Sequence, residues 1–410
     1  MGLTTTVNIT VPVHPHEHVP GGRAGFVAPG ALGAISFTVS DLAAATAQAS
    51  ALSSAPLSLV QAICTGIEAL LSVIVDCSSG RLLVTNDHNE LADFGRTDLS
   101  AGLGAGIAHL YMLSLGYAFR CNGREIYKSG SVPDVLYSGW PTARGNFVAA
   151  EAKGQVRAKV TRSTLRSVVM LGFVDQVLPL LSGPRADRRL LHGYSIGTGV
   201  VPGDPNGASV FVVEADVGPS GGGRRQSAGQ QANQGQVAVQ PVMATANFRA
   251  NLILAGVADA VNVIDSTTPG APIKLNSERL FETISWQGRE VFIAKQAHLS
   301  SGLFTGCRQP RSTFGLDAEI ATAFLQGLAR ENVESIDLPL VSELALTAEN
   351  RPSVGTRFPD GLVYFGNAGW ETEPNREPKD LEPPAHHNPS FEEIQNYREE
   401  GGLTAGADGT

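Results

Sequence analysis

The chain has 410 residues, of which 42% are hydrophobic, and its 30 basic and 39 acidic residues give a formal net charge of −9. This length and hydrophobic content are typical of a globular protein with one large domain or two. The negative total charge argues against a nucleic-acid-binding surface that covers most of the molecule.

The first 95 residues are predicted to form an N-terminal region that precedes the core of the fold. A strand is predicted at 7–13 and helices over 40–95. His14, His16 and His18 alternate in a proline-rich stretch, and such a cluster can bind a transition metal. The prolines favour a surface loop instead. The apolar segment 57–75 contains Gln61 and Glu68, so it predicts a core helix rather than a membrane span.

Two further features bear on location. The N-terminus lacks a basic region followed by an apolar core, which predicts no signal peptide, no membrane association and a cytoplasmic protein. The four cysteines have no metal-type spacing, which predicts free thiols in a reducing compartment. They are Cys64, Cys77, Cys121 and Cys307.

A run of elements is predicted from residue 97 onward. Thr97 or Asp98 is a candidate N-cap for a helix that ends near Ser114, and a strand is predicted at 117–121. Asn122-Gly123 is a hairpin-type turn signal. Strands at 132–138 and 146–153 follow, joined by a glycine- and proline-containing turn, and this hairpin would bring Asp134 beside Glu151.

The hairpin places two carboxylates and one ammonium together. Because the side chains of a strand alternate, Glu151 and Lys153 share one face. Mg²⁺ prefers oxygen ligands and keeps several waters, so Asp134 and Glu151 are candidate ligands for Mg²⁺ or Mn²⁺. Lys153 can orient an attacking water or stabilise the negative charge of a phosphoryl transition state. The alternative is a solvated ion pair at a strand edge.

Pro133-Asp134 and Glu151-Ala152-Lys153 resemble the signature of the PD-(D/E)xK, or restriction-endonuclease-like, nuclease superfamily. The resemblance covers about residues 95–215. It implies an α/β fold with an αβββαβ core, in which a mixed central sheet is flanked by helices. It also implies that the Ala152 backbone carbonyl is a third metal ligand. Asp98 is an additional candidate ligand, because some of these nucleases use an acid of the first helix, although helix capping also explains it.

The elements after the motif continue this order. A helix is predicted over 163–181, and apolar runs at 190–201 and 208–217 can complete the sheet. Gln155 and Gln176 are polar residues that could reach substrate or the waters of a metal, and His109 lies within the first helix. For these three, an ordinary structural role is the favoured interpretation.

Residues 144–189 contain nine basic and three acidic residues, so this region is locally positive by six charges. Clustered cations neutralise phosphates and supply most non-specific affinity for nucleic acid. A solvated helix face is the alternative. The candidate nucleic-acid contacts are Arg144, Arg157, Lys159, Arg162 and Arg166.

Composition divides the chain into five regions: 1–95, the nuclease-like core 96–217, a flexible Gly/Gln-rich loop 218–239, an α+β region 240–370 and a disordered acidic tail 371–410. The α+β region has a predicted helix over 243–260, a hairpin over 280–295 and a helix over 316–330.

The sequence therefore predicts a metal-dependent phosphodiester hydrolase that acts on DNA, with RNA as the alternative substrate. By analogy of fold, host defence or restriction is the expected setting. The competing hypothesis is a non-catalytic nucleic-acid-binding or protein-assembly module on a nuclease-like scaffold. A homo-oligomer or a protein partner is compatible with either.

Overall fold

The computed structural model describes residues 8–23, 26–50, 66–67, 70–71, 73–139, 142, 145–182, 185–216, 236–266, 280–286, 288–294, 314–328, 335–339 and 356–364. All of them belong to one compact unit, Met1–Gly369. The predicted acidic tail and most of the predicted loop at 218–239 lie outside the described residues.

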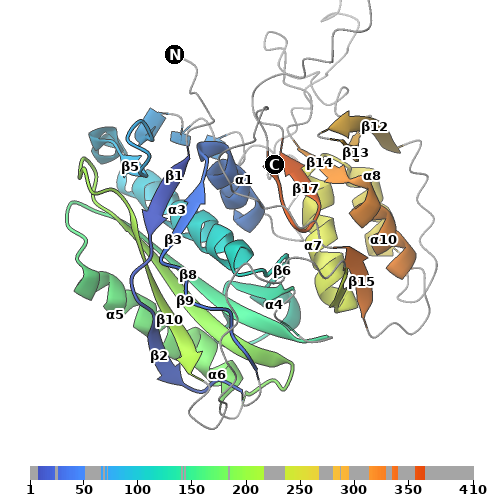
Figure 1. The fold of residues 1–410 in the computed structure, drawn as a ribbon, viewed down its shortest axis with the longest axis horizontal. Coiled ribbons are helices and arrows are strands. Elements are labelled where there is room, and N and C mark those ends of the chain that lie inside the picture. The colour runs from blue at the N-terminus through green and yellow to red at the C-terminus, as the bar shows by residue number, and fades with distance from the viewer. Residues whose placement is uncertain are drawn as a thin grey trace, which may run out of the picture. The chain divides into compact units, whose positions relative to one another are not determined.

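A six-stranded mixed sheet forms the centre of the fold, in the order β2-β10-β9-β8-β7-β6 (Figure 1). Neighbours are antiparallel except β8 with β9 and β2 with β10, which are parallel. The α/β class predicted from the sequence is therefore confirmed. The strands are β2 (Glu17–Pro20), β6 (Phe119–Asn122), β7 (Val135–Ser138), β8 (Phe147–Val156), β9 (Leu190–Val200) and β10 (Ser209–Asp216).

Helices cover both faces of this sheet. Helix α3 (Asp93–Ser114) packs on one face, and α1 (Val39–Ser50) packs against α3. The opposite face carries α5 (Arg162–Gly172), a π-helical turn (Phe173–Val177) and α6 (Leu178–Leu181). Successive residues of β8 reach opposite layers, because Gly154 contacts the α3 backbone whereas the Lys153 side chain contacts Gly172 of α5.

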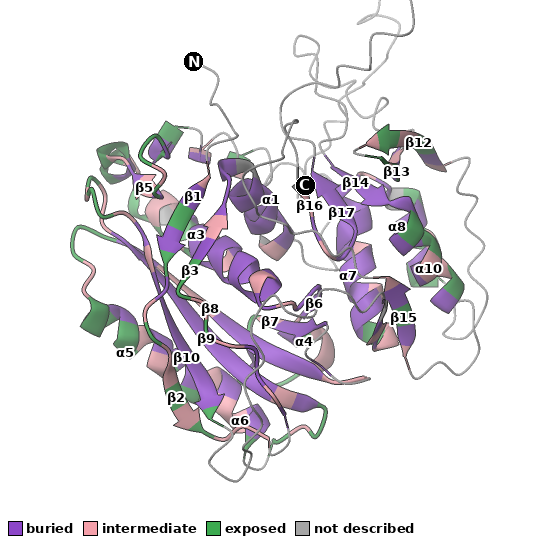
Figure 2. Ribbon diagram, in the orientation of Figure 1, coloured by how far each residue is buried: buried purple, intermediate pink, exposed green. Residues whose placement is uncertain are grey.

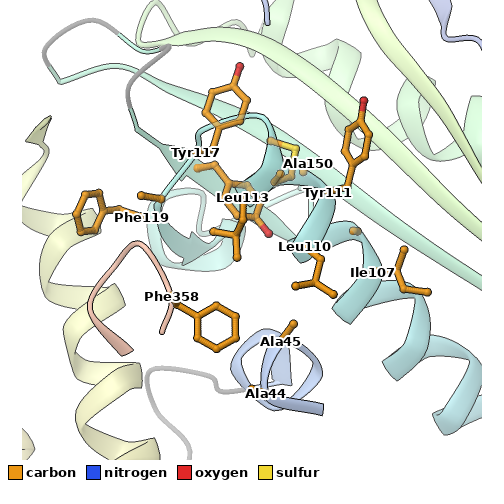
Figure 3. Packing of buried hydrophobic residues seen from close by; sticks show 14 of the residues in the cluster. Ala44, Ala45, Ile107, Leu110, Tyr111, Leu113, Tyr117, Phe119, Ala150 and Phe358 are labelled. Atoms are coloured by element: carbon orange, nitrogen blue, oxygen red, sulfur yellow. The ribbon is translucent and has the colours of Figure 1, made fainter. Parts of the chain in front are cut away.

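The apolar core is continuous between α1, α3 and the sheet. Figure 2 shows most strands of the central sheet buried, with edge strand β2 intermediate or exposed, and Figure 3 shows Leu110 of α3 close to Ala45 of α1. The predicted apolar spacing of the first helix is confirmed, since its leucines and isoleucine are at most 7% exposed. Small residues on α1 and α3 permit close packing.

One described helix, Arg162–Leu181, is long and apolar enough by length and composition to cross a membrane. Its apolar residues Leu165, Val169, Phe173 and Val177 are buried against the sheet. One face of this helix therefore packs on the sheet, whereas Leu171 and Val174 are exposed.

The remaining N-terminal elements are short. They are β1 (Ile9–Pro12), β3 (Ala34–Phe37), β4 (Val75–Asp76), β5 (Leu83–Val84), the 3₁₀ turn Asn86–Glu90 and α4 (Gly123–Ile126). The C-terminal elements are β11 (Gln236–Val239), α7 (Pro241–Leu254), α8 (Ala258–Ser266), β12 (Phe281–Trp286), β13 (Arg289–Ala294), β14 (Phe314–Asp317), α10 (Ala318–Leu328), β15 (Ile336–Pro339), β16 (Thr356–Arg357) and β17 (Leu362–Tyr364). The predicted hairpin is confirmed as β12–β13, with Gly288 at φ 75° in its turn.

Two predicted boundaries near the motif are wrong. Helix α3 begins at Asp93, so Thr97 and Asp98 lie inside it, and the Thr97 hydroxyl donates to the Asp93 carbonyl over 2.9 Å. The Asn122-Gly123 pair makes no hairpin turn. Instead, the Asn122 side chain accepts a 2.8 Å hydrogen bond from the Arg124 backbone and caps α4.

Three other predictions also need correction. The helix predicted over 243–260 is two helices, because Gly256, at φ 81°, ends α7 before α8 begins. The strands β4 and β5 interrupt the helical region predicted over 40–95. The surface loop predicted for His16 and His18 is instead edge strand β2 and the residue before it, and both rings contact the buried Glu214 carboxylate.

The close approach of α3 to β8 depends on Gly154. A Cβ on Gly154 would lie 1.7 Å from the Ser100 carbonyl oxygen, which is a rigid backbone atom. We therefore expect Gly154→Ala to reduce the free energy of unfolding by about 2 to 3 kcal/mol, measured by urea unfolding with circular dichroism. Gly33→Ala is the control, because a Cβ on Gly33 would have no atom within 4 Å. Equal stability of the two variants would contradict this account of the packing.

Candidate functional site

The register of β7 and β8 sets the position of the motif residues. Val135 pairs with Ala150 in an antiparallel register. The residue before Val135, Asp134, therefore lies beside the residue after Ala150, Glu151, as the sequence predicts. The Asp134 backbone N–H donates to Glu151 Oε2 over 3.0 Å, and the Ala152 N–H donates to Asp134 Oδ2 over 3.0 Å. Each carboxylate is thus held by the backbone of the other strand.

Glu151 is enclosed by its neighbours. Its side chain is 1% exposed, and Oε1 accepts hydrogen bonds from the Lys153 ammonium and, over 2.7 Å, from Gln176 Nε2. The π-helical turn at 173–177 carries Gln176 to this position. A Cβ on Gly172 would lie 2.9 Å from Lys153 Cε and 3.2 Å from Glu151 Cγ, so Gly172 packs closely against the pair.

The environment of Glu151 opposes its ionisation. The pKa of Glu151 is raised to about 7, mainly by burial and also by the nearby Asp134 carboxylate, whereas the contacts with Lys153 act in the opposite direction. Near neutral pH the carboxyl is therefore divided between its protonated and ionised forms. A group of this kind, perturbed by burial and by a second carboxylate, is typical of functional sites.

Asp134 and Lys153 line a groove of about 770 Å³ between the N-terminal half of α3 and strands β7 and β8. The Ala152 residue also lines it, whereas Glu151 does not. The floor and walls combine small residues of α3 with polar groups. The polar lining residues include His88, Asn89, Asp93, Arg96, Thr97, Asn122, Gln155 and Arg157.

The donors at the motif are oxygens. Two carboxylates and the Ala152 carbonyl make a set that suits Mg²⁺ or Mn²⁺, which commonly bind one or two carboxylates and complete their shell with water and substrate oxygens. Within the described part of the chain, no cluster of three or more His, Cys, Asp or Glu side chains is arranged to hold a metal. The residues therefore fit a water-rich ion and do not fit an all-protein cage.

Other candidates lie apart from this point. Asp98 is exposed on α3 and does not line the groove. His109 is buried, with Nδ1 2.9 Å from the Tyr137 hydroxyl and Nε2 2.7 Å from Gln48 Oε1, as the structural interpretation predicts. Gln155 lines the groove, and Gln176 contacts Glu151 directly.

Some of the basic residues predicted to contact nucleic acid already contact other side chains of the protein, and others are exposed. Arg166 pairs with Glu17 over 2.5 Å, and the Arg162 guanidinium lies 5.9 Å from the centre of the Phe211 ring. Arg157 and Lys159 are exposed, and Arg157 borders the groove. Arg144 lies outside the described residues.

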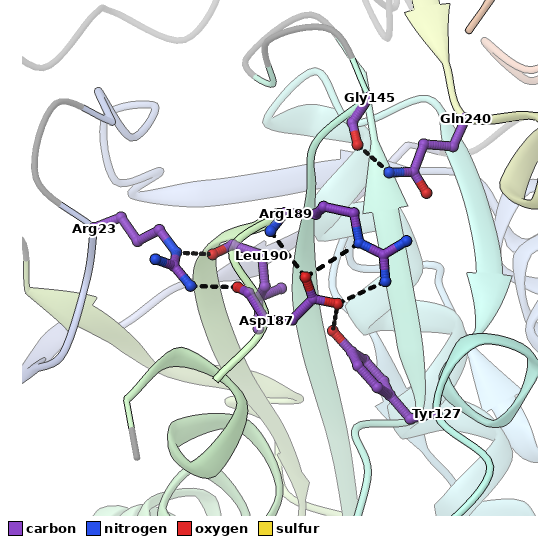
Figure 4. A network of polar contacts seen from close by, with 7 residues as sticks. All are labelled: Arg23, Tyr127, Gly145, Asp187, Arg189, Leu190 and Gln240. Carbon is purple, nitrogen blue, oxygen red and sulfur yellow. Dashed lines mark hydrogen bonds and ion pairs between the residues drawn. The ribbon is translucent and has the colours of Figure 1, made fainter. Parts of the chain in front are cut away.

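Part of the local positive charge serves the fold. Figure 4 shows Arg189 bound to Asp187 at the start of β9, where Asp187 also accepts a 3.1 Å hydrogen bond from the Tyr127 hydroxyl. Arg185 donates to the Ser131 and Ser129 carbonyls, each over 2.8 Å. These arginines hold loops together, so the charge count of residues 144–189 overstates what faces a ligand.

The groove also holds residues that the sequence did not single out. His88 and Arg96 precede or begin α3, outside the motif, and no local pattern marks them as functional. Only the packing of this segment beside the end of β8 brings them to the groove.

No protein-family model matches the chain, and neither the curated proteins nor the solved structures include one that is similar to it.

Proposed function

We propose that the chain is a metal-dependent nuclease that hydrolyses phosphodiester bonds of DNA, with RNA as the alternative substrate. The observation that carries this proposal is the meeting of Asp134, Glu151 and Lys153 on two adjacent strands at the side of an open groove. Two carboxylates beside an ammonium provide metal ligands together with a group that stabilises negative charge.

The order of elements supports a restriction-endonuclease-like core. Helix α3 is followed by the antiparallel strands β6, β7 and β8, then by α5, and then by β9, which is parallel to β8. This is the αβββαβ order of that fold, with the short helix α4 added between the first two strands. The motif residues lie at the start of β7 and on β8 within it.

Each residue has a role that its surroundings favour. Asp134 and Glu151, with the Ala152 carbonyl, hold the ion. Bound Mg²⁺ supplies an acidified water and neutralises a phosphoryl oxygen. Lys153 positions the attacking water or stabilises the negative charge that develops on the phosphate, and its side chain is 28% exposed. Gln176 keeps the Glu151 carboxylate oriented.

One observation favours a second candidate, a non-catalytic scaffold that binds nucleic acid or protein partners. Both oxygens of Glu151 are already occupied by donors of the protein, and its side chain is only 1% exposed. In the nuclease, Glu151 must release some of these donors when it binds an ion. In the scaffold, the same contacts are permanent.

Substitution of the three motif residues separates these candidates. We expect Asp134→Asn, Glu151→Gln and Lys153→Ala each to reduce cleavage by about 100-fold or more, because each removes a ligand or a charge needed in the transition state. The assay uses supercoiled plasmid, linear DNA and RNA, each with Mg²⁺, Mn²⁺ or EDTA.

Asp175→Asn and Asp98→Asn are matched controls, since both carboxylates are exposed and neither lines the groove. Both variants should cut like the unmodified protein. Binding of nucleic acid without metal-dependent cleavage of any substrate would instead favour the scaffold.

The raised pKa of Glu151 predicts a pH dependence of stability. Its ordinary pKa of 4.5 rises to about 7 in the fold, so the protein takes up a proton on folding between these values. This contribution is complete below pH 4.5 and is lost as pH rises through 7, which amounts to at most about 3 kcal/mol. Glu151→Gln cannot titrate, so in EDTA its unfolding free energy should fall less between pH 5 and pH 8 than that of the unmodified protein.

The affinity for a metal ion should rise with pH, whereas the contribution of Glu151 to stability falls. An ion binds the ionised carboxylate, so binding releases a proton wherever Glu151 is protonated. We expect the affinity for Mn²⁺ to increase about tenfold per pH unit below pH 7 and to level off above it. Isothermal titration in buffers of different ionisation enthalpy measures both the affinity and the released proton. A flat profile from pH 5.5 to 8 would rule out Glu151 as a ligand with this pKa.

A further inference from the structure

His88 is a buried polar residue whose ring nitrogens form no hydrogen bond of normal distance and angle with a described residue. Its side chain belongs to the 3₁₀ turn that precedes α3, is 1% exposed and lines the groove. Burial lowers the pKa of His88, and the Asn89 side chain, which lies near the ring, acts in the opposite direction.

An unpaired buried imidazole destabilises a fold unless another group satisfies it. With its pKa lowered, the ring is neutral at neutral pH and offers one donor and one acceptor. A structural histidine such as His109 has both nitrogens bonded within the protein. His88 differs, and its place in the wall of the groove indicates that its partner comes from outside.

The start of α3 adds a preference for anions. The helix has 22 residues, and among the described residues no side chain caps its first turn at Ala92. The free N–H groups and the dipole of a long helix favour a negative charge at this end. Arg96 also lines the groove here and is paired with Asp93, whose side chain is 91% exposed and can be displaced by a ligand.

We propose that His88, Arg96 and the first turn of α3 form a phosphate-binding site at one end of the groove. The site is separate from the Asp134–Glu151 pair, and its assignment to a nucleic-acid backbone rests on the proposed function. Asp134 lines the same groove as His88 and Arg96, so one strand that lies along the groove can contact both places.

A phosphate at this site has two possible sources: an internal phosphodiester and the terminal phosphate of a cut strand. Both present the same oxygens to Arg96 and to the helix N–H groups. The sources differ in where the strand continues, so a probe with a 5′-hydroxyl distinguishes them from a probe with a 5′-phosphate.

The test measures binding in EDTA, where no cleavage occurs. Labelled single-stranded oligonucleotides with a 5′-phosphate or a 5′-hydroxyl are titrated with the full chain and followed by fluorescence anisotropy. We expect His88→Leu and Arg96→Gln to weaken binding about tenfold. Arg124→Gln, which changes an exposed arginine that does not line the groove, should have an effect below about twofold.

Thermal unfolding gives a second measurement. Inorganic phosphate, compared with chloride at equal ionic strength, should raise the melting temperature of the unmodified protein but not that of His88→Leu. Without phosphate, His88→Leu should unfold at an equal or higher temperature, because it removes an unsatisfied polar group. If the leucine variant does not fold, His88→Asn replaces it in the binding assay.

The outcomes separate the two proposals. Unchanged binding of both oligonucleotides by His88→Leu and Arg96→Gln overturns the phosphate site, whatever the nuclease assay shows. A His88-dependent loss of binding in a protein that cuts no substrate keeps the phosphate site and rejects the nuclease. Dependence only with the 5′-phosphate assigns the site to strand ends, and dependence with both probes assigns it to the backbone.

Discussion

The pairing of β7 with β8 is the constraint on which the rest of the site depends. A slip of one residue would move Glu151 and Lys153 to the face covered by α3. That face is closed at Gly154, where the helix backbone leaves no room for a side chain. The observed register is therefore the one that leaves space for Glu151 and Lys153 beside Gly172 and puts Asp134 next to the carboxylate.

The same register creates an electrostatic conflict that the surroundings only partly relieve. Glu151 is buried and close to a second carboxylate, and both effects raise its pKa. Lys153, Gln176 and a backbone N–H oppose them. A divalent cation would reverse the balance, because it replaces repulsion between two carboxylates by attraction of both.

The groove is bordered by Asp134 and extends to the start of α3. Its lining includes Asp134 and Lys153 as well as His88, Arg96 and Asp93 at the start of α3. The close contact between α3 and β8 at Gly154 fixes the positions of these residues relative to one another.

The sequence by itself determined that the side chains of β8 alternate between two faces and that α3 has an apolar face, because both depend on local periodicity. It also determined which acidic, amide and ammonium groups the motif carries, because these depend on residue chemistry alone. It did not determine the start of α3, the cap made by Asn122 or the β2 edge strand, since each results from contacts with distant residues. Only the tertiary structure decided that Glu151 is enclosed, that several arginines serve the fold and that His88 faces the groove. Burial is a property of what packs around a side chain, and no local pattern encodes it.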